Sequence, residues 1–466
     1  MNILDSELVQ EQLQALGYQF TSIAADADVV LLNTCSVRQL AEQKVWSQLG
    51  RLAIEKRENN NDLVVGVLGC MAEREGAELV KRMPHIDVLC GPSELDKLPG
   101  LLQNAMQNRQ RQVALSGHTS RRSATLEKAE DGVEALDLSR SFSATRSSKQ
   151  AYVRITRGCN KFCTYCVVPY TRGPEVHRPP LAIVQEVRSL VEQGVLEVTL
   201  LGQTVNHYVF QDGGKTTSFA DLLAMIHDQV PDLQRLRFLT SYPRDFDDAT
   251  LDVMAASPRM CKYLHIPAQS GSNEMLRKMN RGYTVETYFG LIERARMRMP
   301  DIRFAGDIIV GFPGETDADH EATRLLIQKV RYKSCYIFKY SPRSGTVADR
   351  RFVDDVPDDV KKARNRDLLD LQNGIALEIH SAMIGQEIDV IVEGFSPLRV
   401  HRPQPGEVQL GWEKRSAEST SHVRLMGRTQ GDEIIAFEGS GDLVGKLVTV
   451  KVTEATQLSM RGQMVP

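Results

Sequence analysis

The sequence predicts an α/β protein of three successive parts: a Rossmann-like N-terminal domain, a partial (βα) barrel and a small C-terminal β-barrel. In residues 1–107 and 145–375, short apolar runs alternate with helical patterns, which predicts the first two parts. In residues 376–457 the helical patterns stop and glycines separate short strand patterns. The segment 108–144 is rich in Ser, Arg, Ala and Glu, which is typical of a linker.

Composition narrows the class of protein. The chain has 466 residues, enough for several domains. Its formal net charge of −3 does not indicate a nucleic-acid partner, so any basic surface must be local. No apolar run is long enough to span a bilayer, and the acidic, amphipathic start is not typical of a signal peptide. We therefore expect a cytoplasmic protein without a membrane partner. There the eight cysteines are expected to be ligands or core residues rather than disulfides.

The N-terminal part is predicted to form a parallel sheet. Its expected elements are a helix over Asp5–Leu16, a strand over Val29–Leu32, a helix over about Val37–Glu58, and strands over Leu63–Leu68 and Asp87–Leu89. In such sheets binding sites form beyond the carboxyl ends of the strands. Cys35, Cys70 and Cys90 all follow strand patterns, although Cys90 is better explained as a small buried apolar residue.

Six strand patterns predict the central barrel and four predict the C-terminal one. The first set is Tyr152–Ile155, Val195–Leu201, Leu236–Leu239, Tyr263–Ile266, Phe304–Val310 and Cys335–Phe338, with helices such as Leu181–Gln193 and Val285–Arg298 between them. Since a closed barrel of this type has eight strands, we expect an incomplete one. The second set is Ile388–Val392, His422–Leu425, Glu433–Phe437 and Leu447–Val452.

Three closely spaced cysteines follow the first of the six barrel strands. Cys159, Cys163 and Cys166 have C-x3-C-x2-C spacing, so their thiolates could ligate three irons of a [4Fe–4S] cubane and leave the fourth iron open. An open iron can chelate the amino and carboxylate groups of a small molecule. A structural zinc site is the alternative, but it needs four ligands, and only His177 lies close behind. We favour the cluster.

Polar residues at the ends of other barrel strands are candidate contacts for a small-molecule cofactor. Loop capping is an equally reasonable role for most of them. The exception is Asp307, which lies inside an apolar run, where a carboxylate is expensive unless it is paired. The candidates are Gln203, Asn206, Ser241, Gln269 and Asp307.

Five motifs together carry a specific family resemblance. They are Arg157–Gly173, Asn33–Val37, Leu201–Asn206, His265–Gly271 and Asp307–Thr316. With them the chain resembles the radical S-adenosylmethionine methylthiotransferases, and within these the tRNA-2-methylthio-N6-dimethylallyladenosine synthase family. The resemblance covers nearly the whole chain, and the linker and the segment 393–420 are the least typical parts. It implies a domain with an auxiliary [4Fe–4S] cluster, a radical S-adenosylmethionine barrel and an RNA-binding TRAM domain, in that order.

The resemblance also implies the reaction. S-adenosylmethionine would be cleaved at the cluster on Cys159, Cys163 and Cys166, and a methylthio group would replace the hydrogen at C2 of N6-dimethylallyladenosine, at position 37 beside the anticodon of a tRNA. An aromatic C–H has no acidity that a side chain could exploit, which explains the need for a radical. The implied partners are tRNA and a reducing electron donor, and we expect a monomer. Basic residues near the C-terminal strands could contact RNA phosphates: Arg424, Arg428, Lys446 and Lys451.

One departure concerns the auxiliary cluster, which the family binds with three cysteines. Cys35 and Cys70 match the second and third, whereas Met1 aligns just after the first, so that cysteine and the strand before it are absent. Either the natural protein starts upstream, which we favour, or this site is broken. The alternative functions are methylthiolation of a threonylcarbamoyladenosine or of a ribosomal-protein aspartate, and an RNA-binding relative that cannot insert sulfur.

Overall fold

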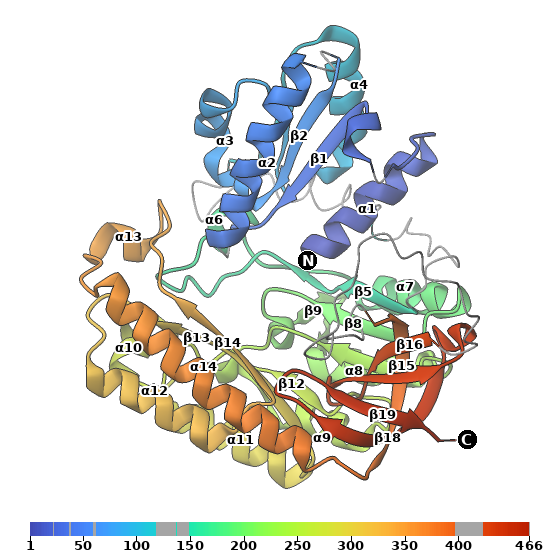
Figure 1. The fold of residues 1–466 in the computed structure, drawn as a ribbon, viewed down its shortest axis with the longest axis vertical. Coiled ribbons are helices and arrows are strands. Elements are labelled where there is room, and N and C mark those ends of the chain that lie inside the picture. Colours follow the sequence, from blue (N-terminus) through green and yellow to red (C-terminus); the bar gives the residue numbers. More distant parts are fainter. Residues whose placement is uncertain are drawn as a thin grey trace, which may run out of the picture.

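The computed structural model describes residues 1–21, 23–36, 39–58, 62–117, 137, 149–396 and 423–465. The N-terminal domain lies on one side of a curved barrel sheet, and the C-terminal barrel lies against another side of it (Figure 1). Most of the predicted linker and His422 of a predicted strand fall outside the described residues. No helix in the described part of the chain is long and apolar enough to cross a membrane.

The N-terminal domain is a four-stranded parallel sheet in the order β1-β2-β3-β4. Its strands are β1 Val29–Thr34, β2 Val64–Gly69, β3 Val88–Cys90 and β4 Gln112–Ala114, and its helices are α1 Asn2–Ala15, α2 Gln39–Glu58, α3 Cys70–Arg82 and α4 Leu98–Asn108. The three predicted strands are confirmed. The sequence missed β4, which lies in the predicted linker and pairs with β3, so the sheet continues past residue 107. Val113 is the one large apolar residue of β4 and is exposed, so no apolar run marks this strand.

The central part contains all six predicted strands, and every pairing between them is parallel. They form two three-stranded sheets, β11-β8-β5 and β12-β13-β14, with a bridge between Leu236 and Met260 where the two meet. The strands are β5 Gln150–Arg154, β8 Glu197–Leu201, β11 Arg235–Phe238, β12 Tyr263–His265, β13 Arg303–Val310 and β14 Ser334–Lys339. This is the expected open (βα) barrel.

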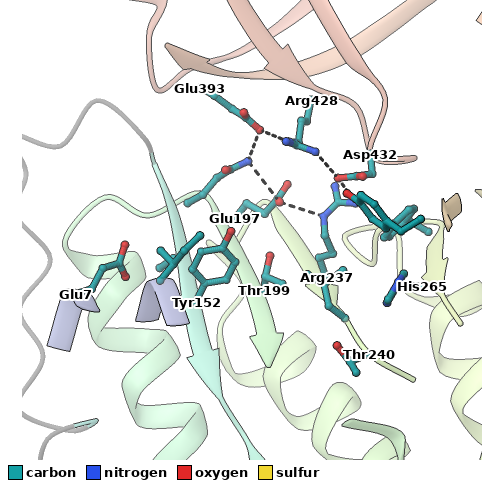
Figure 2. A pocket seen from close by; sticks show the side chains of 16 residues that line it. Glu7, Tyr152, Glu197, Thr199, Arg237, Thr240, His265, Glu393, Arg428 and Asp432 are labelled. Atoms are coloured by element: carbon teal, nitrogen blue, oxygen red, sulfur yellow. Dashed lines mark hydrogen bonds and ion pairs between the residues drawn. The ribbon is translucent and has the colours of Figure 1, made fainter. Parts of the chain in front are cut away.

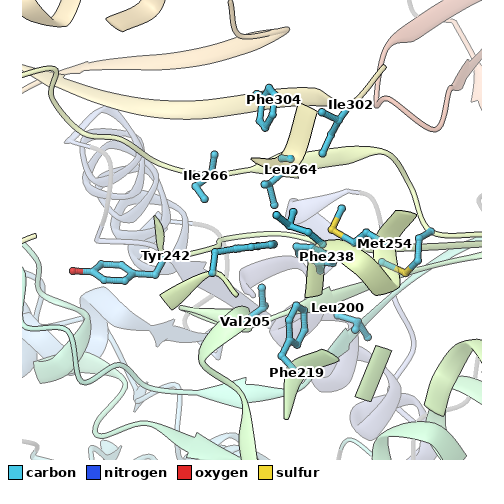
Figure 3. Packing of buried hydrophobic residues seen from close by; sticks show 14 of the residues in the cluster. Leu200, Val205, Phe219, Phe238, Tyr242, Met254, Leu264, Ile266, Ile302 and Phe304 are labelled. Carbon is cyan, nitrogen blue, oxygen red and sulfur yellow. The ribbon is translucent and has the colours of Figure 1, made fainter. Parts of the chain in front are cut away.

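Helices cover the outside of this sheet. The longer ones are α7 Pro180–Glu192, α8 Phe219–Gln229, α9 Asp248–Ala256, α11 Val285–Arg298, α12 Asp317–Val330 and α14 Asp358–Ser381. A single apolar core lies between helices and strands (Figure 3). In β8, Val198 and Leu200 belong to this core, whereas Glu197 and Thr199, also buried, point into the barrel (Figures 2 and 3). Each strand therefore buries an apolar face outward and a partly polar face inward.

The C-terminal domain is a closed five-stranded barrel in the order β15-β16-β17-β19-β18. Its strands are β15 Glu387–Phe395, β16 Val423–Arg428, β17 Ile434–Gly439, β18 Leu447–Ala455 and β19 Met460–Met464. Two expectations need correction. The predicted boundary at residue 376 falls inside α14, and β19 lies beyond the predicted end at residue 457. The sequence missed β19 because only Met460 in it is fully buried, so no apolar alternation marks it.

Candidate functional site: the cysteine loop and the cavity beside it

The three closely spaced cysteines lie on the loop that runs from the short strand β6 Thr156–Arg157 to the short helix α6 Val168–Thr171. β6 pairs with β7 Val176–His177, which follows α6. The amide of Cys159 donates to the carbonyl of Gly173 at 3.2 Å. Gly158 has φ +65°, and a Cβ there would overlap the carbonyl oxygen of Pro174. Only glycine fits this backbone conformation and this close approach to the Pro174 carbonyl, so Gly158 determines the path of the loop at this point.

The other end of the loop is fastened to the segment after α10 Asn273–Lys278. The amide of Thr164 donates to the carbonyl of Met279 at 3.0 Å, and the amide of Ala348 donates to the carbonyl of Thr164 at 2.7 Å. Asn280 donates to the carbonyl of Phe162, whose φ is +48°. These bonds tie the loop backbone to the rest of the barrel, so the thiols are presented by a fixed scaffold.

Burial shapes the chemistry of the thiols. It raises the pKa of Cys159 to about 11, against hydrogen bonds from the Lys161 amide and the Thr204 hydroxyl that lower it. Burial, reinforced by the neighbouring Cys163, raises the pKa of Cys166 to about 12. Both groups are therefore neutral thiols at pH 7 unless a cation stabilises the thiolates. A bound metal centre supplies that charge.

Arg281 is a residue at this site that the sequence did not reveal. It is 6% exposed, and its Nη1 donates to the Cys163 Sγ at 3.2 Å. Its Nε donates to the Tyr283 hydroxyl at 3.1 Å, and its Nη2 donates to the carbonyl of Pro267 at 3.2 Å. Nothing in its spacing marks it, because 118 positions separate it from Cys163. The run Asn280-Arg281-Gly282 resembles a solvated turn in the sequence.

A cavity of about 690 Å³ opens beside the loop. Tyr165 and Cys166 from the loop line it, together with Ser36 from the N-terminal domain. Gln269 and Asp307, two predicted cofactor contacts, lie on its barrel side. The volume is in the usual range for a small-molecule site, about 300–1,000 Å³. The cavity therefore joins the two domains that carry the candidate cluster ligands.

Gln269 and Asp307 are held together by the sheet. The Gln269 amide donates to the carbonyl of Asp307 at 2.8 Å, and Gln269 has φ +72°. The Asp307 carboxylate lies 3.3 Å from Nε2 of His265, which is the pairing that a carboxylate inside an apolar run requires.

The other three predicted contacts are not among the described residues that line this cavity. Asn206 uses its amide side chain to hold the backbone of Tyr242, donating to its carbonyl at 3.0 Å and accepting from its amide at 2.7 Å. This is the loop-capping role. Ser241 is buried with no hydrogen-bond partner for its hydroxyl in the described chain, and Gln203 is half-buried in the turn after β8.

Cys35 and Cys70 follow neighbouring strands. The last residues of β1 and β2, Thr34 and Gly69, are paired, so the two thiols lie at the same edge of the sheet. Cys35 is half-buried and Cys70 begins α3. Arg172 from the barrel reaches this edge: it pairs with Asp5 at 2.7 Å and also hydrogen-bonds the Cys70 thiol.

The remaining cysteines belong to the packed interior. Cys90 is fully buried, and its thiol donates to the carbonyl of Glu94 at 3.2 Å, so the interpretation as a core residue is confirmed. Cys261 and Cys335 are buried as well.

A group of two histidines and a glutamate lies next to the loop. Glu175, His177 and His207 each bring a ligand atom within 4.8 Å of the others. However, Nδ1 of His177 accepts from the Val209 amide at 3.1 Å, which leaves the neutral ring protonated at Nε2 without a free lone pair. Nδ1 of His207 bonds Glu175 at 2.7 Å. We interpret the group as a hydrogen-bonded brace of the hairpin rather than a metal centre.

A second cavity, of about 470 Å³, lies inside the barrel under the C-terminal domain (Figure 2). An ion-pair network crosses it: Arg237 contacts Glu197 at 3.1 Å, and Arg428 contacts Glu393 at 2.8 Å and Asp432 at 3.0 Å. Arg428 is thus engaged inside the protein, so its expected role in RNA binding lacks support. His265 and Tyr336 line both cavities.

The open barrel, its loop of three thiols and the adjoining cavity define a radical S-adenosylmethionine enzyme. The model of that superfamily matches residues 153–327, the model of the uncharacterized protein family UPF0004 matches residues 1–91, and the TRAM domain model matches residues 415–465. A solved radical S-adenosylmethionine methyltransferase from Kitasatospora setae has 18% identity, covers 74% of this chain and 70% of its own, and gives a TM-score of 0.54. It shows a common fold.

Similar full-length sequences define the family. The chain is 40% identical to a tRNA-2-methylthio-N6-dimethylallyladenosine synthase of Carboxydothermus hydrogenoformans, over 100% of this chain and 97% of the relative. It is 38% identical to the enzyme of that name from Rhodopirellula baltica, over 100% and 93% of the two chains. The chain belongs to the tRNA-2-methylthio-N6-dimethylallyladenosine synthase family and is a radical S-adenosylmethionine methylthiotransferase.

Proposed function

We propose that this enzyme replaces the C2 hydrogen of N6-dimethylallyladenosine, at position 37 of a tRNA, with a methylthio group. The supporting observation is the cavity that Ser36, next to Cys35, and Cys166 both line. A substrate base in this cavity would meet the radical source on one side and the sulfur-bearing domain on the other. The family membership supports the choice of base.

The thiols of Cys159, Cys163 and Cys166 fit a [4Fe–4S] cluster. They share one preformed loop, and at least two are too buried to ionise without a cation. A cluster held there supplies the electron that cleaves S-adenosylmethionine into methionine and a 5′-deoxyadenosyl radical. Gln269 and Asp307, which line the cavity, would contact the cofactor, while Gln203, Asn206 and Ser241, which do not line it, would support the neighbouring loops. Tyr165 helps to exclude water.

Cys35 and Cys70 are the proposed ligands of the auxiliary cluster. Their place at one sheet edge, with Arg172 donating to Cys70, suits a negatively charged group. These are two of the three ligand positions that the family resemblance implies, and we assign no third. tRNA would dock on the C-terminal barrel, where Arg424 and Lys451 lie on β16 and β18. The electron would come from an external reductant.

The test is an anaerobic assay of reconstituted enzyme with dithionite, S-adenosylmethionine, sulfide and an anticodon stem-loop. One RNA carries N6-dimethylallyladenosine and the other carries threonylcarbamoyladenosine. We expect the methylthio nucleoside by mass spectrometry from the first RNA alone. Methylthio product from the RNA with threonylcarbamoyladenosine would instead assign the enzyme to the alternative function, methylthiolation of that nucleoside. 5′-Deoxyadenosine without any methylthio product would mean that this chain does not insert sulfur.

Matched cysteine variants assign the two clusters. Cys163→Ala should abolish 5′-deoxyadenosine formation, whereas Cys35→Ala should keep it and lose the methylthio product. Cys261→Ala, which removes a buried core thiol, should keep both. The wild type should bind about eight irons and each ligand variant about four. Persisting 5′-deoxyadenosine in Cys163→Ala would refute the radical site.

A further inference from the structure

Among the described residues, Arg281 is a buried cation without a carboxylate partner. Most other buried arginines have one, as Arg154 does in Asp5 and Arg237 does in Glu197; Arg235 instead donates to two backbone carbonyls. None of the ion pairs in the described residues includes Arg281, whose partners are the Cys163 thiol, the hydroxyls of Tyr165 and Tyr283, and a backbone carbonyl. Burying an unpaired charge costs several kcal/mol, so this arrangement calls for an anion.

Aromatic rings only partly offset that cost. The guanidinium lies 4.8 Å from the centroid of Tyr242 and 5.4 Å from that of Tyr283. Such contacts are favourable when desolvated, but they do not neutralise the charge. They also confine the guanidinium plane, so that Nη1 stays aimed at Cys163. The geometry therefore holds a fixed positive charge against one of the three thiols.

We propose that Arg281 is the countercharge of the cluster on Cys159, Cys163 and Cys166, and that it eases reduction of that cluster. A cubane held by three thiolates is negatively charged and gains one more negative charge on reduction. A fixed cation at 3.2 Å from a ligand sulfur favours the more negative state. Hydrogen bonds to ligand sulfurs and local charge are established controls of cluster potential. The inference rests on the proposed barrel cluster and names Arg281 as a positioning residue for it.

The experiment is a redox titration of the barrel cluster, followed by electron paramagnetic resonance. A Cys35→Ala/Cys70→Ala background leaves the barrel cluster alone. In that background Arg281→Met should shift the reduction equilibrium at least tenfold toward the oxidised state, which is about 59 mV for one electron. Arg281→Lys, which keeps the charge, should recover most of the shift. Arg244→Met is the matched control, because Arg244 also faces the Tyr242 ring but is half-exposed and paired with Asp245.

The stability of the cluster-free protein shows whether Arg281 acts through its charge on the cluster or is needed for folding. Since Arg281→Met removes an unpaired buried cation, the cluster-free variant should unfold at the same urea concentration as the background protein or a higher one. If Arg281→Met cannot load iron, loading by Arg281→Lys together with a stable cluster-free Met variant still supports the countercharge. An unchanged potential in Arg281→Met, a shift equal to that of Arg244→Met, or unfolding of both Arg281 variants would overturn it. Absence of any cluster signal in the background protein would instead refute the proposed radical site.

Discussion

The contact between α1 and the central barrel, at Arg154 of β5 and Arg172 after α6, should be sensitive to a single charge. The Asp5 carboxylate is 2% exposed and contacts Arg154 at 3.2 Å and Arg172 at 2.7 Å. Asp5→Asn keeps the size of the side chain but removes the charge. Arg154 keeps Asp137 at 2.7 Å, whereas Arg172 has no other carboxylate partner among the described ion pairs. Breaking a buried ion pair costs about 3–5 kcal/mol of stability, and because Arg154 keeps Asp137 as a partner, we expect a loss of about 3 kcal/mol for Asp5→Asn.

A loss of about 3 kcal/mol is more than 100-fold in the equilibrium between docked and open α1. Hydrogen exchange measures it directly, because the amide of Leu8, whose side chain packs against Leu201, exchanges when the helix opens. The control is Asp252→Asn, whose partner Arg298 lies 2.6 Å away at an exposed site, where a pair contributes less than about 1 kcal/mol. Unchanged exchange of α1 in Asp5→Asn, or an equal change in the control, would refute the reasoning.

Three further outcomes follow from the site. Gly158→Ala should lower the amount of iron that the cysteine loop retains, because the new methyl group overlaps the Pro174 carbonyl at a φ of +65°. Iron content after gel filtration measures this loss. Gly213→Ala is the control, because a Cβ at Gly213 would meet no atom within 4 Å. The cluster-free protein should lose more stability than the loaded protein as pH rises from about 9 through 12, since burial raises the pKa of Cys159 to about 11 and of Cys166 to about 12 above their unfolded value of 9.0 and favours the neutral thiols. Urea titrations with and without the cluster check the difference, because other buried groups with a raised pKa, such as Cys261 and Tyr288, titrate in both forms. Arg235→Met should weaken the attachment of the C-terminal barrel and lower the affinity for tRNA without lowering 5′-deoxyadenosine formation. The variant leaves the carbonyls of Arg428 and Asp389, which accept from Arg235 at 2.6 and 2.7 Å, without this donor. An unchanged affinity for tRNA in a filter-binding assay would contradict this prediction.

The parts that the sequence predicted correctly are those with local patterns. All six barrel strands are apolar runs, because parallel strands covered by helices need apolar residues on their outer face. The helix over Val285–Arg298 has the predicted bounds, since Thr284 caps its start and accepts from the Thr287 amide. The cysteine spacing likewise placed three thiols on one loop, because these three residues are close in the chain.

The parts that the sequence missed depend on distant contacts. Asp137 lies in the segment predicted as a linker, yet it is 1% exposed and binds Arg154 and Arg157. In the sequence it is one acid in a polar run, and only the fold reveals the arginines that neutralise it. Arg281 shows the same limit, because its partner sulfur comes from another loop. Charged residues resemble solvated ones until the structure shows what surrounds them.

The open barrel explains why residues of all three domains line the second cavity. Six strands do not close, so the inner polar residues of β8 and β11 need covers. Ile3 and Glu7 of α1 supply one cover, and Glu393, Arg428 and Asp432 of the C-terminal barrel supply the other (Figure 2). His265 and Tyr336 line both this covered space and the cysteine cavity, so the two cavities share part of a wall. The domain that would bind RNA and the domain that would carry sulfur are thus both anchored on the strands that present the radical source.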